Sequence, residues 1–143
     1  MKYSHKLSDA VHILSYIDIY QNNDLSSKAI ATSVESNPSV IRQLMSDLRN
    51  AGLIETHKGS AKPSLAKNSS KISLLDIYQA INMDHRILHV DPKTNPHCIV
   101  GGNIQNVLDH IYSEIELQAF TKMSKVSLQD IIDEIMEQSQ KNR

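Results

Sequence analysis

The stretch NPSVIRQLMSDLRNAG, residues 37–52, determines the fold more than any other part of this chain. Asn37 before a proline is a strong helix start, because its side chain accepts hydrogen bonds from free backbone N–H groups and proline suits the first helical position. The apolar residues that follow recur at spacings of three and four: Ile41, Leu44, Met45 and Leu48. Gly52 stands where a helix commonly ends. The stretch therefore predicts an amphipathic helix over about 38–51.

The opposite face of this helix carries side chains that donate hydrogen bonds: Ser39, Arg42, Gln43, Ser46 and Arg49. Such side chains bind base edges and phosphates in a DNA major groove. The N-terminal residues of a recognition helix reach deepest, so Ser39, Arg42 and Gln43 are the candidate base contacts, followed by Ser46. An ordinary solvated helix face has a similar composition, so the helix alone leaves both interpretations open.

The neighbouring segments favour the DNA interpretation. Apolar spacing predicts a helix over about 6–21 and a short helix from Ser26 or Ser27 to about Val34. After the 38–51 helix, residues 53–57 are typical of a strand, 58–63 of a turn and 64–67 of a returning strand. Helix, short helix, turn, helix and hairpin are the order of a winged helix-turn-helix, so we expect a mainly α fold with a small β-hairpin wing.

The predicted wing is basic. Residues 56–71 contain four lysines and no acid, with a histidine among them: His57, Lys58, Lys62, Lys67 and Lys71. A projecting basic turn can follow a phosphate backbone. Ser27 and Lys28, at the start of the short helix, could bind another phosphate with help from the helix N-terminus. The candidate wing contacts are His57, Lys58 and Lys62, and the expected partner is a double-stranded DNA operator.

A repeated segment organises the second half of the chain. Residues 70–77 resemble residues 124–131, and each copy has the pattern of a capping box, which predicts helices over about 74–82 and 128–139. The longest predicted helix, about 103–122, has a four-three-four apolar spacing: Ile104, Leu108, Ile111 and Ile115. We interpret this stripe as a homodimer interface, and burial within its own domain is the alternative. The chain then divides into a DNA-binding domain, 1–82, and a part with a sensor loop, dimerisation helix and last helix, 83–143.

Composition excludes several classes of protein. The chain has 143 residues, of which 40% are hydrophobic and 22% charged, as in a globular domain. The sequence has no apolar run of membrane-spanning length and no secretory signal pattern, so we expect a cytoplasmic protein without membrane contact. The net charge of −1 is unevenly spread: residues 1–71 carry nine Lys and Arg against six acids, and residues 72–143 carry six against ten. A basic first half is consistent with a nucleic-acid partner.

Cys98 is the only cysteine, so one chain cannot form an internal disulfide or a cysteine-rich metal site. It precedes the longest helix, where His97 or the helix N-terminus can lower the thiol pKa, and it is therefore the redox-sensing candidate. A role as an inert small hydrophobic residue is the alternative. The remaining histidines, among them His85, His89 and His110, form no clear ligand set, so we predict no metal, and no catalytic residues are assigned.

Residues 39–54, followed by His57-Lys58-Gly59, resemble the Rrf2 family of bacterial transcription regulators. Residues 72–77 are similar to that family's Ile-Thr-Leu-x-Asp-Val segment, and the similarity extends over essentially the whole chain. The resemblance implies a homodimeric winged-helix repressor whose long helix forms the interface and whose last helix packs onto the DNA-binding part. Arg42 stands where the family often has Glu, Lys58 matches the usual wing Arg, and residues 60–65 replace the family's Gly-Gly-Tyr wing.

Many members of that family hold an iron–sulfur cluster on three cysteines. This chain has one, so it resembles a subgroup without the cluster, and we predict no cofactor. The sequence therefore predicts a sequence-specific DNA-binding regulator, most simply a repressor, that responds to thiol oxidation at Cys98 and is not an enzyme. The alternatives are a winged-helix module that binds an acidic protein instead of DNA, and a thiol enzyme.

Overall fold

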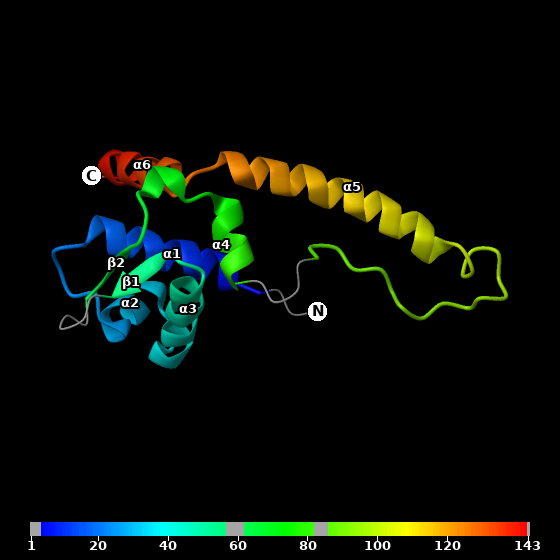
Figure 1. The fold of residues 1–143 in the computed structure, drawn as a ribbon, viewed down its shortest axis with the longest axis horizontal. Helices are drawn as coiled ribbons and strands as arrows, with labels where there is room; N and C mark the ends of the chain where they lie inside the picture. The colour runs from blue at the N-terminus through cyan, green and yellow to red at the C-terminus, as the bar shows by residue number, and fades with distance from the viewer. Residues whose placement is uncertain (1–3, 57–61, 82–85, 143) are drawn as a thin grey trace.

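The computed structural model describes residues 4–56, 62–81 and 86–142. Three helices, a two-stranded sheet and three further helices follow one another along the chain (Figure 1). The elements are α1 (Lys6–Ile19), α2 (Ser27–Val34), α3 (Pro38–Asn50), β1 (Ile54–Thr56), β2 (Pro63–Leu65), the 3-10 helix η1 (Ser69–Lys71), α4 (Leu74–Ile81), α5 (Ile104–Lys125) and α6 (Leu128–Lys141). The predicted mainly helical winged helix-turn-helix with a long C-terminal helix is confirmed.

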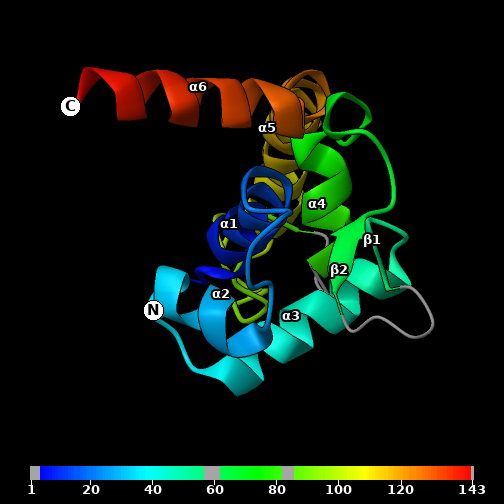
Figure 2. The same cartoon turned by 90° about the vertical axis from the view of Figure 1, so that its left-hand side faces the viewer.

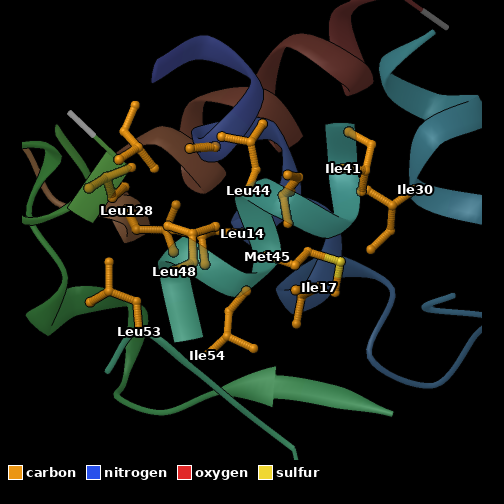
Figure 3. Close-up of a cluster of buried hydrophobic side chains, with 14 of the residues drawn as sticks. Leu14, Ile17, Ile30, Ile41, Leu44, Met45, Leu48, Leu53, Ile54 and Leu128 are labelled. Atoms are coloured by element: carbon orange, nitrogen blue, oxygen red, sulfur yellow. The ribbon is translucent and has the colours of Figure 1, made fainter. Parts of the chain in front are cut away.

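One aliphatic core holds α1, α2, α3, α4 and the start of α6 together. The stripe of α3 contributes Ile41, Leu44, Met45 and Leu48, none more than 6% exposed, and these pack on Leu14 and Ile17 of α1 (Figure 3). Local signals fix the two ends of the helix-turn-helix. Ser26 accepts from the N–H of Ala29 at 3.2 Å, and Asn37 accepts from the N–H of Ser39 at 2.9 Å. Because the α3 stripe faces inward, its polar residues face solvent.

The wing is a short antiparallel hairpin. β1 pairs with β2 in the register Ile54↔Leu65, Glu55↔Ser64 and Thr56↔Pro63. The strand prediction needs correction, because β2 begins at Pro63, which the sequence pattern assigns to the turn, and ends at Leu65 instead of Lys67. Proline is tolerated at the first residue of a strand, where its missing N–H is not needed for pairing. The tip of the predicted wing, with His57 and Lys58, lies outside the described residues.

The two repeated segments, residues 70–77 and 124–131, contact each other within the chain. Both capping boxes form, with Ser73 and Asp76 at the start of α4 and Ser127 and Asp130 at the start of α6. The copies also pair as an antiparallel bridge at Ser73↔Ser127. The N–H of Leu74 donates to the Val126 carbonyl at 2.8 Å, and the N–H of Leu128 donates to the Ile72 carbonyl at 2.7 Å. The bridge fixes the start of α6 to the body, where Leu128 and Ile132 join the core.

Helix α5 differs from the others because it leaves the body. Near its C-terminal end it packs on α4, where the rings of Tyr78 and Phe120 lie 5.5 Å apart, and the rest extends away (Figure 1). Residues 86–103 run beside it to its far end. The single buried residue of α5 is Glu116, a carboxylate. Among the described residues, no helix is long and apolar enough to cross a membrane.

Candidate DNA interface and sensor segment

A cleft of about 420 Å³ lies where α2, α3 and the wing strands meet. Figure 2 shows α2, α3 and the strands on one side of the body and α6 on the opposite side. The cleft combines two guanidinium groups with hydroxyl groups and apolar side chains, and none of its described lining residues is an acid. It is lined by Leu25, Ser26, Ser27, Arg42, Met45, Arg49, Thr56 and Pro63.

Arg42 and Arg49 come to the same cleft because they are seven residues, about two turns, apart on α3. Both are exposed. Ser27 of α2 lines the same cleft as Arg42, and the Ser27 hydroxyl lies 4.0 Å from the Met45 sulfur. Arg49 lies on the polar face that the sequence predicts, but it is not one of the predicted DNA contacts. Its heptad spacing from Arg42 is the signal that places it there.

The first turn of α3 presents a mixed surface. The Ser39 hydroxyl donates to the Asn37 side-chain oxygen at 2.8 Å, so in this arrangement Ser39 offers DNA an acceptor. Val40 beside it is 45% exposed, although it is apolar. Val40 is not among the predicted contacts, although its position off the core stripe of α3 indicates an exposed apolar side chain. The Gln43 amide donates to Asp47 at 3.1 Å, so it must turn away from that carboxylate to reach a base. Ser46 is half-buried.

Near the start of α2, the negative charge of Asp24 is accompanied by the positive charges of Lys28 and Lys62. Ser26 donates its N–H to Asp24 at 2.9 Å, and this bond holds the pKa of the Asp24 carboxyl below its usual value. The positive charge of Lys62 acts in the same direction, so the base of the wing lies within electrostatic reach of Asp24. Lys28 and Lys62 are both exposed. Neither lines the cleft, so any contact they make with DNA would lie outside it.

Cys98 lies in a series of turns that leads into α5, and its side chain is exposed. Hydrogen bonds from the backbone N–H groups of Gly101 and Val100 lower the pKa of the thiol below its ordinary value. The cause is therefore the turn before the helix, not His97. A Cβ at Gly101 would collide with the Asn95 carbonyl, so this tight turn requires glycine there.

The exposed face of α5 carries the predicted stripe. Ile104 and Leu108 are half-buried, whereas Ile111 and Ile115 are 43% and 48% exposed. Val107, which widens the apolar surface beside this stripe, is 53% exposed. No described element of the same chain covers these three side chains further, so the stripe presents an apolar surface to solvent.

A polar cluster on another face of α5 holds residues 86–88. One carboxylate oxygen of Glu116 accepts from Arg86 Nε at 3.1 Å and from the N–H groups of Ile87 and Leu88, each at 3.2 Å. Arg86 also binds Asp109 at 3.1 Å, and its pKa is raised mainly by that hydrogen bond. Sequence alone did not reveal this cluster, because a single acid on a helix looks like a solvated residue.

A helical body with a wing, a cleft of two arginines on α3 and a projecting apolar helix define a winged helix-turn-helix protein of the type that regulates transcription. The Rrf2 model, described as iron-dependent transcriptional regulator, matches residues 3–134. The chain therefore belongs to the Rrf2 family, as its motifs indicated.

Several known proteins are similar to this chain over most of its length. YwnA of Bacillus subtilis (strain 168), assigned as an HTH-type transcriptional regulator, is 34% identical over 130 residues, or 91% of this chain and 96% of that protein. A crystal structure described as a DNA-binding protein is also 34% identical, with a TM-score of 0.72 and coverage of 89% of this chain and 98% of that one. CymR, described as the global cysteine regulator of B. subtilis, shares the fold at a TM-score of 0.67 and 20% identity, over 93% of this chain and 97% of that one.

The residues of this chain do not fit the iron that the family description implies. The whole sequence offers one thiol, Cys98. Within residues 4–56, 62–81 and 86–142, no group of three or more His, Cys, Asp or Glu side chains is placed to hold a metal ion. His85 lies outside these ranges. A cysteine-ligated iron–sulfur cluster needs more thiolates than one chain supplies.

Proposed function

We propose that this chain is a sequence-specific DNA-binding regulator that works in the cytoplasm as a homodimer. The observation that supports the proposal is the cleft lined by Arg42 and Arg49 of α3 and by Ser27 of α2, with no acid among its described lining residues. Arginine is the side chain best suited to bidentate bonds with guanine and to phosphate contacts. A recognition helix that presents two arginines beside apolar side chains is suited to bind in a major groove.

The proposed contacts divide into two groups. Ser39, Arg42 and Gln43, near the N-terminal end of α3, contact base edges, and Ser46 lies behind them. The second group contacts phosphates, which positions the protein without specifying sequence. It comprises Ser27, Lys28, Arg49, His57, Lys58 and Lys62.

The homodimer follows from the exposed stripe of α5. Covering a half-exposed Val107, Ile111 or Ile115 side chain contributes on the order of 1 kcal/mol, and a two-fold axis covers each of them twice. A dimer also presents two α3 helices to the same face of DNA, one helical turn or about 34 Å apart.

Mobility-shift assays on fragments of the source genome test DNA binding. We expect a salt-sensitive complex with a small set of fragments. Arg42→Ala should change which fragments bind, whereas Arg49→Ala, its matched control on the same face, should weaken all fragments about equally. If no fragment is selected at any salt concentration, the DNA-binding proposal is wrong. Specific capture of an acidic protein, with a flat response to DNA, would favour the alternative of a protein-interaction module.

The proposed signal is oxidation of Cys98. Its thiolate attacks a hydroperoxide, the O–O bond breaks, and the products are the sulfenic acid and, from hydrogen peroxide, hydroxide that takes up a proton as water. The exposed thiol and the backbone N–H groups that stabilise its thiolate support this step. Footprinting with and without hydrogen peroxide, on wild type and Cys98→Ser, tests it. Equal responses of the two proteins would exclude Cys98 as the sensor.

We also propose that the bound dimer represses transcription by occupying promoter DNA. In transcription reactions with purified RNA polymerase and a selected fragment, adding the protein should lower transcript yield. Peroxide should restore it for the wild type but not for Cys98→Ser. An increase in transcript on adding the protein would identify an activator instead.

A further inference from the structure

A polar hollow of about 470 Å³ lies between the C-terminal end of α1, strand β2, η1 and the start of α6. Consecutive residues of a strand point to opposite sides of the sheet. Pro63 of β2 accordingly lines the cleft that contains Arg42, whereas Ser64 lines this hollow. The segments around the hollow meet at the end of the molecule remote from the far end of α5 (Figure 1). The hollow is therefore separate from the proposed DNA contacts and from the α5 stripe.

The described lining of the hollow contains one acid and one base. Asp18 and Gln21 are three residues apart on α1, so their side chains lie on the same side of the helix, next to the hollow. Lys67, two residues after β2, lines the hollow as well. Neither Asp18 nor Lys67 forms a hydrogen bond or ion pair with another described residue, and Asp18 is half-buried. A half-buried carboxylate in this state favours a ligand that brings a positive charge.

Two side-chain amides in the hollow are held in place by hydrogen bonds. Ser69, which is only 5% exposed, donates its hydroxyl to the Gln129 side-chain oxygen, and the Gln129 amide nitrogen donates to Asp133 at 2.7 Å. The Asn68 side-chain oxygen accepts from the N–H and the hydroxyl of Ser70, at 2.9 and 2.7 Å. This arrangement leaves the NH₂ group of Asn68 as a donor. The hollow thus offers an anionic group a fixed amide donor besides the lysine ammonium group.

We infer that this hollow binds a small zwitterion, a molecule with one ammonium and one carboxylate group, as in a free amino acid. Asp18 accepts hydrogen bonds from the ammonium group, and Lys67 and the Asn68 amide donate to the carboxylate. Charge-assisted hydrogen bonds of this kind are stronger than neutral ones. A simple anion or a simple cation would leave one of the two protein charges unmatched. The volume of the hollow falls in the range of small-molecule pockets, roughly 300–1,000 Å³.

A molecule in the hollow contacts the wing and the second half of the chain together. Ser64 belongs to the wing, and Gln129 belongs to α6, whose start is joined to the body by the Ser73↔Ser127 bridge. A zwitterion that links these segments changes how the wing is held, and by reciprocity DNA then changes the affinity for the zwitterion. This consequence rests on the proposed DNA binding, whereas the site itself does not.

Calorimetric titration of the full chain without DNA tests the site, with the common L-amino acids as probes, one at a time. We expect at least one of them to bind with a Kd below about 1 mM. Asp18→Asn and Lys67→Gln should each weaken it about ten-fold or more, since each removes a hydrogen bond to a charged group. The matched controls, Asp9→Asn on α1 and Lys71→Gln on η1, lie outside the hollow and should leave its affinity unchanged. No binding of any amino acid, or equal binding by wild type, Asp18→Asn and Lys67→Gln, would overturn the inference.

Analogues of the bound amino acid show which side chain recognises which charge. An analogue without the ammonium group lacks the partner of Asp18, so Asp18→Asn should not weaken its binding further. An analogue without the carboxylate should be equally insensitive to Lys67→Gln. If the variants lose the same factor for the amino acid and for the analogues, the two side chains only maintain the shape of the hollow, and the assigned recognition is wrong.

The coupling to DNA is measured separately, by fluorescence anisotropy with a fragment that the protein selects. A saturating concentration of the amino acid should change the affinity for this fragment about three-fold or more, within the usual range of coupling between sites. Asp18→Asn should abolish this change. An affinity that the amino acid leaves unaltered would overturn the coupling. A protein that binds the amino acid but selects no DNA would contradict the proposed function and leave the zwitterion site standing.

Discussion

At the residue scale, Val40 is the side chain in the first turn of α3 that is both apolar and exposed. It leaves 45% of its surface in solvent, next to the candidate base contacts Ser39 and Arg42. In a major groove, an apolar side chain at this position would contact the methyl group of thymine, which distinguishes T·A from the other pairs. Val40 therefore extends the proposed recognition surface beyond hydrogen bonding.

We expect Val40→Ala to lower affinity about three- to ten-fold for fragments with thymine at one position of each half-site. Fragments with uracil there, which lack the methyl group, should bind wild type and variant alike. Selection of binding sites from a random pool, followed by titration of thymine and uracil versions, measures the effect. Equal losses on both versions would show that Val40 acts through the fold of α3 instead.

Cys98 should react as a thiolate at lower pH than an ordinary cysteine. The N–H groups of Gly101 and Val100 stabilise the charged form, so its pKa is lowered. The reactive form is thus present above this lowered pKa and is lost only as the pH falls below it. The rate of alkylation by iodoacetamide, measured from pH 5 to 10 on the native and urea-unfolded protein, should show the lower midpoint for the native state. Coinciding midpoints would contradict the role of the turn.

At the element scale, one carboxylate fixes residues 86–88 to α5. Glu116 accepts from the Ile87 and Leu88 N–H groups, so Glu116→Ala leaves two backbone donors without their acceptor. Because both hydrogen bonds are only partly buried, losing their acceptor costs on the order of 1 kcal/mol, at the low end of the range for buried donors. We expect hydrogen exchange at these two amides to accelerate about ten-fold or more, measured by mass spectrometry. Glu116→Gln keeps an acceptor oxygen and should have a smaller effect. Exchange that is unchanged in both variants would contradict this role.

The bounds of individual helices are what the sequence predicts well. The pattern of α3 predicts a helix over about 38–51 and the observed bounds are Pro38–Asn50, because a proline, a cap and an apolar stripe are all local signals. Both capping boxes are also recognisable from four residues each. Their mutual bridge is not, because pairing between Ser73 and Ser127 depends on contacts between segments 54 residues apart in the chain. Glu116 was missed for the same reason: its partners lie nearly 30 residues earlier.

At the scale of the whole molecule, the sequence predicted the class of fold, and its division into a DNA-binding half and a dimer-forming half stays a prediction. Arg42 and Ser27 line the same cleft, and their joint role in binding DNA stays a prediction. The direction in which α5 leaves the body could not be predicted, because it depends on how Tyr78 and Phe120 pack and on the bridge that turns the chain into α6. That direction determines how far apart two DNA-binding bodies would stand.

If the α5 stripe couples two such bodies, a charge in its centre should reduce DNA binding without touching the DNA surface. Ile111→Glu places two carboxylates opposite each other across the proposed axis, where they repel and lose their hydration. We expect monomers by sedimentation and at least a ten-fold loss of affinity for a two-half-site fragment, because the second contact is no longer linked to the first. A fragment with one half-site should lose little.

Asn106→Glu is the matched control, since Asn106 is exposed, five residues before Ile111 and so about 140° around the helix. It adds the same charge to α5 away from the stripe and should leave both the dimer and its affinity for DNA unchanged. If Ile111→Glu were dimeric, α5 would not be the interface. If it were monomeric yet bound the two-half-site fragment as tightly as wild type, each body would bind DNA independently, and the spacing set by α5 would have no part in recognition.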